Sequence, residues 1–87
     1  MEKYRKELDM IDESLRDMFI RRMKVVKEIA LYKKAHHLPV EDLKREAKMM
    51  DRLAIDDPVI NRYYQAFLNH VIQVSKQYQE EVIKEDL

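Results

Sequence analysis

The first 35 residues of this 87-residue chain contain neither glycine nor proline, and their apolar side chains recur at helical spacing. One uninterrupted helix is therefore expected over residues 3–35, with a length of about 50 Å at 1.5 Å per residue. A compact chain of this size has a radius of gyration of only about 12 Å, so one end of the helix must project beyond a monomeric core. The apolar stripe continues along that projection and predicts an obligate helical dimer. The stripe consists of Leu8, Ile11, Leu15, Met18, Phe19, Val25, Val26, Ile29 and Ala30.

The chain's two prolines, Pro39 and Pro58, divide it into three segments that each have helical periodicity. A second helix is expected over residues 40–53 and a third over residues 59–83. The sequence therefore predicts an all-α fold with three helices per chain. The expected buried positions are Leu43, Ala47, Met50 and Leu53 on the second helix, and Ile60, Tyr64, Phe67, Leu68, Val71, Ile72 and Tyr78 on the third.

The segments between these helices are short, and the length of the chain suits one domain over residues 1–87. Residues 36–39 form the first connection. In the second connection Asp57 is placed to cap the third helix, and Pro58 suits its first turn. The acidic end at residues 84–87 is expected to fray.

Composition excludes several functional classes. Lys plus Arg and Asp plus Glu number 17 each, whereas nucleic-acid binders normally carry a basic excess. A chain without glycine has no phosphate-binding loop or dinucleotide fingerprint, and one without cysteine has no disulfide or thiolate zinc site. His36 and His37 lack a carboxylate at metal-ligand spacing, and neither Ser14 nor Ser75 has an evident histidine base. We expect no metal and no cofactor, and the lack of a signal peptide or membrane span favours the cytoplasm.

Two cations interrupt the apolar stripe of the first helix. Arg22 and Lys33 are eleven residues apart, about three helical turns, so both point to the side that should be core. Burial of an unpaired charge costs several kcal/mol, so an anion must meet them. One explanation is interhelical ion pairing with Asp42 or Glu46. The other is a site for a small anionic ligand.

A third cation, Arg5, lies seventeen residues before Arg22, about 25 Å along the helix axis. It cannot reach the Arg22 region of its own chain. In an antiparallel pairing of two first helices, Arg5 of one copy can reach the Arg22 region of the other.

The ordered set of these residues resembles the all-helical bacterial-type chorismate mutases over nearly the whole chain. The matching pattern is Arg5-x-x-Leu8-Asp9-x-Ile11-Asp12-x-x-Leu15, then Arg22, Lys33, Pro39-Val40, Asp42-x-x-Arg45-Glu46 and Ser75-x-x-x-Gln79. An ungapped count along the third helix would place Val71 and Ser75 at the last two positions, and the gapped count is preferred.

The resemblance implies an intertwined homodimer with shared active sites that converts chorismate to prephenate in aromatic amino-acid (Phe and Tyr) biosynthesis. Arg22 and Arg5 of the second copy would bind the two carboxylates of chorismate. The resemblance also implies that Arg45 and Ser75 help to bind the carboxylates. Lys33 and Gln79 would donate to the ether oxygen. Glu46 and Asp42 would hold the ring hydroxyl. The catalytic set would be Lys33, Gln79, Arg22 and Glu46.

Three alternatives stay open at this stage. Isochorismate–pyruvate lyase has the same fold, although Glu46 and Gln79 favour the mutase. A non-catalytic dimerisation module would use the inward charges only for pairing, and a regulatory domain would bind the ligand without turnover. The resemblance also leaves open a fusion to another enzyme of the same pathway.

Overall fold

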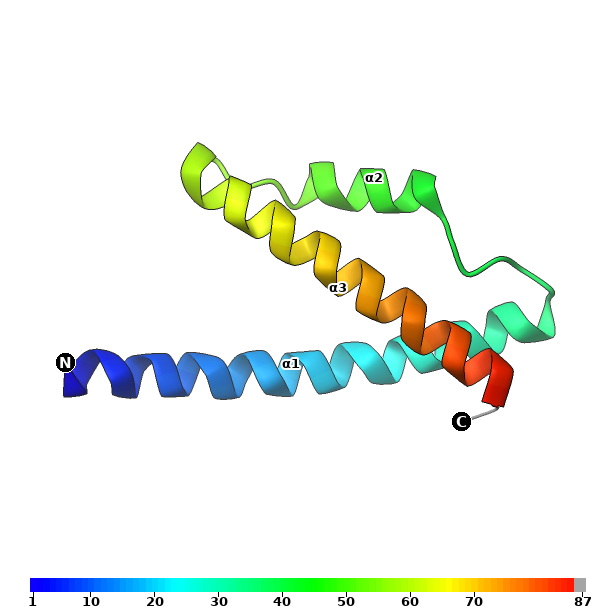
Figure 1. Cartoon of the computed structure of the whole chain (residues 1–87), viewed down its shortest axis with the longest axis horizontal. Coiled ribbons are helices and arrows are strands. Elements are labelled where there is room, and N and C mark those ends of the chain that lie inside the picture. The colour runs from blue at the N-terminus through cyan, green and yellow to red at the C-terminus, as the bar shows by residue number, and fades with distance from the viewer. Residues whose placement is uncertain (86–87) are drawn as a thin grey trace.

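The computed structural model describes residues 1–85, and all of its regular structure in that range is helical. Helix α1 spans Glu2–Ala35, α2 spans Leu43–Arg52 and α3 spans Pro58–Glu85 (Figure 1). The three-helix prediction is confirmed, and α1 and α3 lie within two residues of their predicted bounds. None of the helices in the described range is long and apolar enough to cross a membrane.

The end of α1 shows how a chain without glycine reverses direction. His37 has a φ of 54°, and its N–H bonds to the Lys34 carbonyl at 3.4 Å. The N–H of Leu38 bonds to the Lys33 carbonyl at 2.9 Å, which completes a Schellman motif. Glycine normally takes the left-handed position, but histidine tolerates it better than most residues do. Pro39 follows and prevents the helix from resuming, so the connection begins at residue 36 as predicted, but it extends to residue 42 instead of ending at residue 39.

The predicted start of α2 at residue 40 is wrong, because α2 begins at Leu43. Asp42 has non-helical φ and ψ of −139° and 82°, and its side chain accepts a hydrogen bond from the Arg45 N–H at 3.0 Å. This N-cap sets the boundary, since the carboxylate satisfies a backbone donor that an earlier start would have paired inside the helix.

The start of α3 confirms the predicted cap. Asp57 Oδ1 accepts hydrogen bonds from the N–H groups of Val59 at 2.9 Å and Ile60 at 3.2 Å, and Pro58 is the first helical residue. The prediction of a frayed end is wrong for Lys84 and Glu85, which belong to α3. Residues 86–87 lie outside the described part of the chain.

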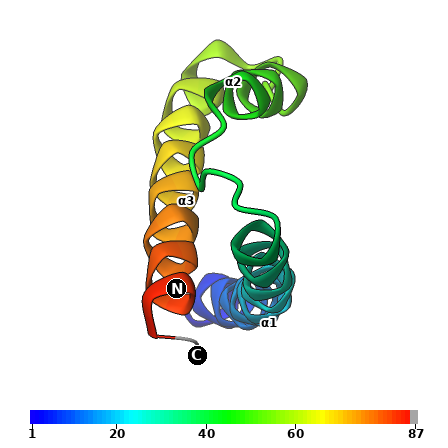
Figure 2. The same cartoon turned by 90° about the vertical axis from the view of Figure 1, so that its right-hand side faces the viewer.

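Helix α3 packs along the C-terminal half of α1, and the N-terminal half of α1 projects away from it (Figure 1). The radius of gyration is 15.8 Å and the longest extent is 50 Å, so the expected projection is present. Viewed along the longest axis of the molecule, α2 is separated from α1 and lies against the first part of α3 (Figure 2). The buried side chains lie at the α1–α3 contact: Val26, Ala30, Leu68, Ile72, Val82, Ser75 and Gln79.

Most of the predicted core positions are exposed in the single chain. Ile11 is 55% exposed on α1, Phe67 is 51% exposed on α3, and α2 has no buried residue at all. The described chain has an accessible surface of 7407 Å², whereas a compact monomer of 10.6 kDa has about 5,500 Å². The helical periodicity identified these faces correctly, but the chain by itself does not cover them.

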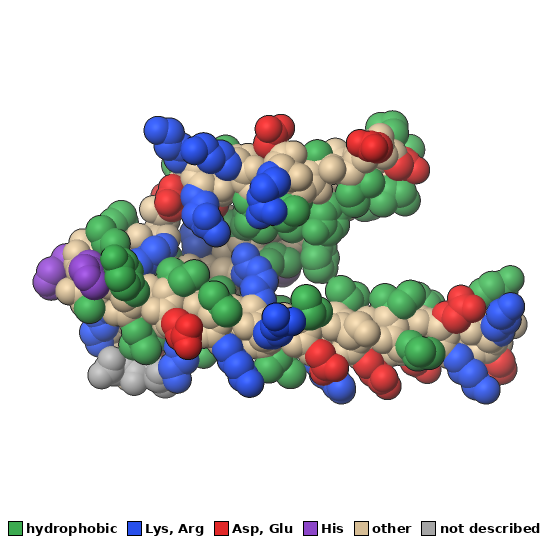
Figure 3. Space-filling model, turned by 180° about the vertical axis from the view of Figure 1, so that it is seen from behind, with side chains coloured by type: hydrophobic (Ala, Val, Ile, Leu, Met, Phe, Trp, Pro, Cys, Tyr) green, Lys and Arg blue, Asp and Glu red, His purple; other side chains and the backbone are tan. Residues whose placement is uncertain are grey.

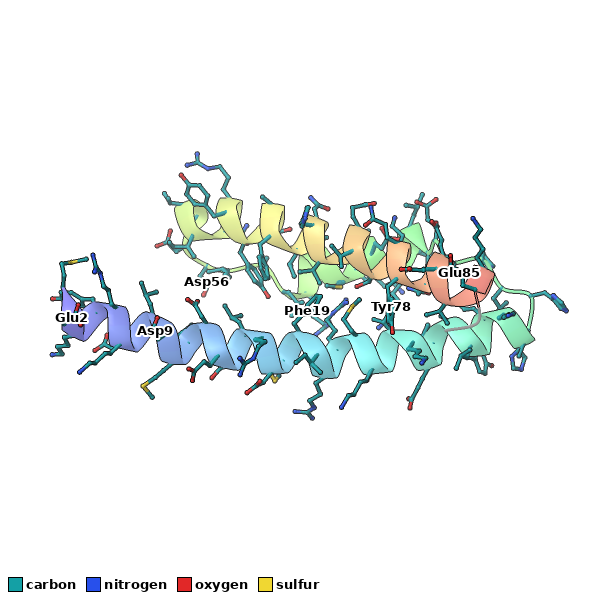
Figure 4. The ribbon with its side chains drawn as sticks, turned by 60° about the horizontal axis from the view of Figure 1, so that its bottom comes forward. Glu2, Asp9, Phe19, Asp56, Tyr78 and Glu85 are labelled. Carbon is teal, nitrogen blue, oxygen red and sulfur yellow. The ribbon has the colours of Figure 1, made fainter. Side chains whose placement is uncertain are left out.

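A deep notch separates the projecting half of α1 from α2 and the start of α3, and hydrophobic side chains line both of its walls (Figure 3). Asp9 on α1 and Asp56 before α3 lie on opposite sides of this open space, whereas Tyr78 lies between α3 and α1 where the two helices meet (Figure 4). The notch ends at that meeting point, and Lys and Arg side chains gather there (Figure 3).

Candidate active site

A cavity lies where the C-terminal half of α1, the start of α2 and the C-terminal half of α3 face one another. Arg5 does not line it, because Arg5 lies in the projecting part of α1, where its guanidinium is 4.0 Å from the Glu2 carboxylate. The other seven predicted site residues all line the cavity: Arg22, Lys33, Asp42, Arg45, Glu46, Ser75 and Gln79.

Helix α1 contributes a single line of side chains to the cavity, in which Val26 and Ile29 stand between Arg22 and Lys33. Arg22 Nη1 donates to Ser75 Oγ on α3, and Ser75 Oγ donates to the Val71 carbonyl at 2.8 Å. The pKa of Arg22 is lowered, first by burial and then by the positive charge of Arg45. Arg22 is thus oriented by a neutral hydroxyl, and no carboxylate of residues 1–85 pairs with its charge.

Lys33 Nζ donates to the Val40 carbonyl at 2.8 Å, which ties the end of α1 to the connection before α2. Within residues 1–85, neither Lys33 nor Arg22 forms an ion pair with a carboxylate. Pairing with Asp42 or Glu46 therefore does not explain the two inward cations.

The start of α2 brings Asp42, Arg45 and Glu46 to the cavity. The Asp42 carboxylate is occupied by the helix cap, and the Asp42 N–H donates to Glu46 Oε2 at 3.4 Å. The other oxygen, Glu46 Oε1, accepts from Lys76 Nζ on α3 at 3.1 Å. Arg45 has no carboxylate within 4.0 Å among the described residues, so it remains a third cation without an ion pair.

Helix α3 supplies Ser75 and Gln79, which are 6% and 7% exposed. Val71 does not line the cavity, so the geometry matches the gapped count along this helix. Gln79 Oε1 is buried and has no hydrogen-bond partner in the described part of the chain. An unsatisfied buried polar atom costs about 1–3 kcal/mol, which a ligand that bonds to the amide would recover.

Six further residues line the cavity; Val26, Ile29 and Ile72 were expected as core residues, whereas Val40, Met49 and Lys76 were not predicted as part of the site. Lys76 bonds to Glu46 and also to Glu41, at 3.1 Å each. Its position three residues before Gln79 on the same helix was a usable signal, because residues at that spacing share a face. Met49 joins Val26, Ile29 and Ile72 in the apolar part of the lining.

This arrangement can bind a small anion and donate hydrogen bonds to it. Arg22, Lys33 and Arg45 offer positive charge without a carboxylate partner, and no histidine or cysteine lines the cavity in the described range. The residues present are therefore suited to orienting a ligand and to stabilising charge that develops on it.

Comparison with known proteins identifies relatives of one kind. The family model for chorismate mutase type II matches residues 4–80. A curated monofunctional chorismate mutase from Enterobacter agglomerans is 48% identical over 40 residues, which is 46% of this chain and 22% of the relative. That match thus spans about a fifth of the relative's length. No solved structure matches the chain.

Proposed function

Because the chain belongs to the chorismate mutase type II family, we propose that it is an isomerase that rearranges chorismate to prephenate. The observation that carries the proposal is the group of three cations, Arg22, Lys33 and Arg45, around one cavity with Gln79. Among residues 1–85 these cations form no ion pair, and the Gln79 amide oxygen has no hydrogen-bond partner. The proposal includes a cytoplasmic location and a place in aromatic amino-acid biosynthesis, as the family resemblance implies.

The reaction suits these residues because it is a unimolecular pericyclic shift, which proceeds without a nucleophile or a general base. A protein accelerates such a step by holding the flexible side chain of the substrate in its folded, reactive conformer. It also places donors where negative charge builds up on the breaking ether oxygen. Arg22, supported by Ser75, and Arg45 would bind the substrate carboxylates.

Lys33 and Gln79, which line the cavity from α1 and α3, would both donate to the ether oxygen. Rotation of the Gln79 amide by 180° exchanges its oxygen and nitrogen, so the buried group can present an N–H to a bound acceptor. Glu46 and the nearby Asp42 would hold the ring hydroxyl of the substrate.

The proposal further includes a homodimer in which Arg5 of a second copy completes each site. The single chain exposes about 1,900 Å² more than a compact chain of its mass, and obligate dimers commonly bury interfaces of 2,000 Å² or more. The notch beside α1 has apolar walls and the length of a helix, so an antiparallel α1 from a second copy suits it (Figure 3). Arg5 of that copy would approach Arg22.

The direct test is to supply chorismate to the purified chain and to follow prephenate formation. Prephenate production at a rate far above the uncatalysed reaction supports the proposal. Pyruvate release from isochorismate without prephenate from chorismate would assign a lyase instead. Binding of chorismate without turnover would assign a regulatory domain. Absence of both binding and turnover would favour a non-catalytic dimerisation module.

The shared site is tested separately with two inactive variants, Arg5→Ala and Arg22→Ala. Co-refolding the two chains should restore one intact site in each heterodimer, giving about a quarter of wild-type activity per dimer in a random mixture. If the mixture stays as inactive as its components while dimers form, Arg5 does not act across the interface.

A further inference from the structure

Lys76 is the one cation of the cavity to which the proposed function gives no role. Its Nζ is 3.1 Å from Glu46 Oε1 and 3.1 Å from Glu41 Oε1. The side chains of Lys76 and Glu46 are 15% and 22% exposed, whereas that of Glu41 is 59% exposed. The Lys76–Glu46 ion pair is therefore sheltered inside the cavity. The Lys76–Glu41 ion pair is exposed, and Glu41 does not line the cavity.

The Lys76–Glu46 ion pair fixes the Glu46 carboxylate, which has few other interactions to hold it. In the described part of the chain, the one donor to Glu46 Oε2 is the Asp42 N–H at 3.4 Å, which is longer than a good N–H···O hydrogen bond. Helix α2 has no fully buried residue, and the Glu46 side chain itself is still 22% exposed, so packing alone does not fix its carboxylate. The charge-assisted bond from Lys76 is thus the strongest interaction that the structure shows for Glu46.

Other charged groups around Glu46 do not replace Lys76. Arg22 and Lys33 face the cavity from α1, but they bond to Ser75 Oγ and to the Val40 carbonyl. From the connection and α2, Asp42 and Glu41 are anionic, and Arg45 forms no ion pair with Glu46. Among residues 1–85, Lys76 alone supplies Glu46 with a cationic donor.

We infer that Lys76 is a positioning residue, which holds the Glu46 carboxylate in the cavity so that one of its oxygens can accept a hydrogen bond from the ring hydroxyl of the substrate. The inference rests on the proposed mutase function and adds a residue that acts through Glu46. The raised pKa of Lys76, caused first by its hydrogen bonds to Glu41 and Glu46, supports it, since the ammonium stays charged throughout the neutral range.

A double-mutant cycle on prephenate formation tests this role, because a residue that acts through Glu46 has no effect once Glu46 is disabled. Lys76→Met is expected to lower kcat/KM about tenfold or more in the otherwise unchanged protein. In the Glu46→Gln background the same substitution should change kcat/KM less than about twofold. Lys48→Met is the matched control, because Lys48 is exposed on α2 and does not line the cavity.

Two results would overturn the inference while the mutase function stands. One is a Lys76→Met variant within about twofold of the Lys48→Met control. The other is an equal loss in both backgrounds, which would mean that Lys76 acts on the substrate or the fold directly. Absence of turnover by the wild-type chain would instead reject the proposed function, and the inference with it.

Folding is checked by circular dichroism and sedimentation before the rates are compared. If Lys76→Met does not fold, Lys76→Gln takes its place in the cycle, since glutamine keeps a neutral donor. The expected loss in kcat/KM is again about tenfold or more in the otherwise unchanged protein and less than about twofold in the Glu46→Gln background. Lys76→Arg should recover most of the activity, because a guanidinium can bond to two carboxylates. An arginine variant as slow as Lys76→Met would contradict the positioning role.

Discussion

Replacement of Arg22 by methionine should separate activity from stability. Arg22 is partly buried, is bonded to the Ser75 hydroxyl and is repelled by Arg45. Its hydrogen bond is worth about 1.5–3 kcal/mol of folding free energy. Replacing a buried ion pair by apolar side chains of similar volume is often neutral or stabilising by about 1–4 kcal/mol, and the Arg22 charge lacks the attraction that such a pair retains. The two effects nearly cancel, so we expect a change within about 1 kcal/mol, or a melting shift below about 8 °C.

The catalytic effect of the same substitution is much larger. A substrate carboxylate left without its cation in a sheltered cavity loses about 3–5 kcal/mol, which lowers kcat/KM by about 10²–10⁴-fold. Prephenate formation and thermal unfolding are measured on the same samples, with Arg21→Met as the control because Arg21 is exposed and lies outside the cavity. A melting temperature lowered by more than about 10 °C, or activity within tenfold of wild type, would refute this reasoning.

Three further expectations can be checked with standard assays. Lys33→Met should retain the helical circular dichroism signal and lose at least about 10²-fold in kcat, whereas an unchanged kcat would exclude Lys33 from the reaction. Ile11→Asp should convert a sedimenting dimer into an inactive monomer, because it places a charge on the exposed apolar face of α1. A dimer that persists at micromolar concentration would argue against that interface. The raised pKa of Lys76 means that its bridge stabilises the fold below the ordinary lysine value of 10.5 and loses this effect as pH rises through the raised value. The difference in urea midpoint between wild type and Lys76→Met should therefore be constant from pH 7 to about pH 10 and shrink above it; a difference independent of pH would contradict the ionic bridge.

The fold was largely predictable because its determinants are local. Helical periodicity without glycine or proline predicted α1, and the pair Asp57–Pro58 predicted the start of α3. The start of α2 was misplaced because Val40 continues the apolar pattern, and periodicity does not show that Asp42 turns its carboxylate onto the Arg45 N–H. The choice between a cap and a helical position depends on backbone angles that the pattern does not contain.

The candidate site was predictable to the extent that it depends on helix geometry. Arg22 and Lys33 follow from their spacing, since eleven residues return to the same face of a helix. The spacing of Lys76 to Gln79 places both on one helix face, but it does not assign Lys76 a role, because a lysine among polar neighbours is typical of a solvated surface. Its role depends on Glu41 and Glu46, which approach it only through the folding of α2 against α3.

The proposed second copy of the chain would cover the exposed apolar faces and would also bring a further cation to the cavity. A cavity with the three cations Arg22, Lys33 and Arg45 is electrostatically unfavourable when empty, and Arg5 of the second copy would add a fourth. Repulsion of this kind amounts to a few kcal/mol. The surface in excess of a compact monomer, about 1,900 Å², would contribute on the order of 20 kcal/mol if half of it is apolar, before the costs of association. Hydrophobic burial therefore outweighs the repulsion. It can hold the cations together before the substrate arrives, so that the dianion meets an electrostatic environment that is already arranged for it.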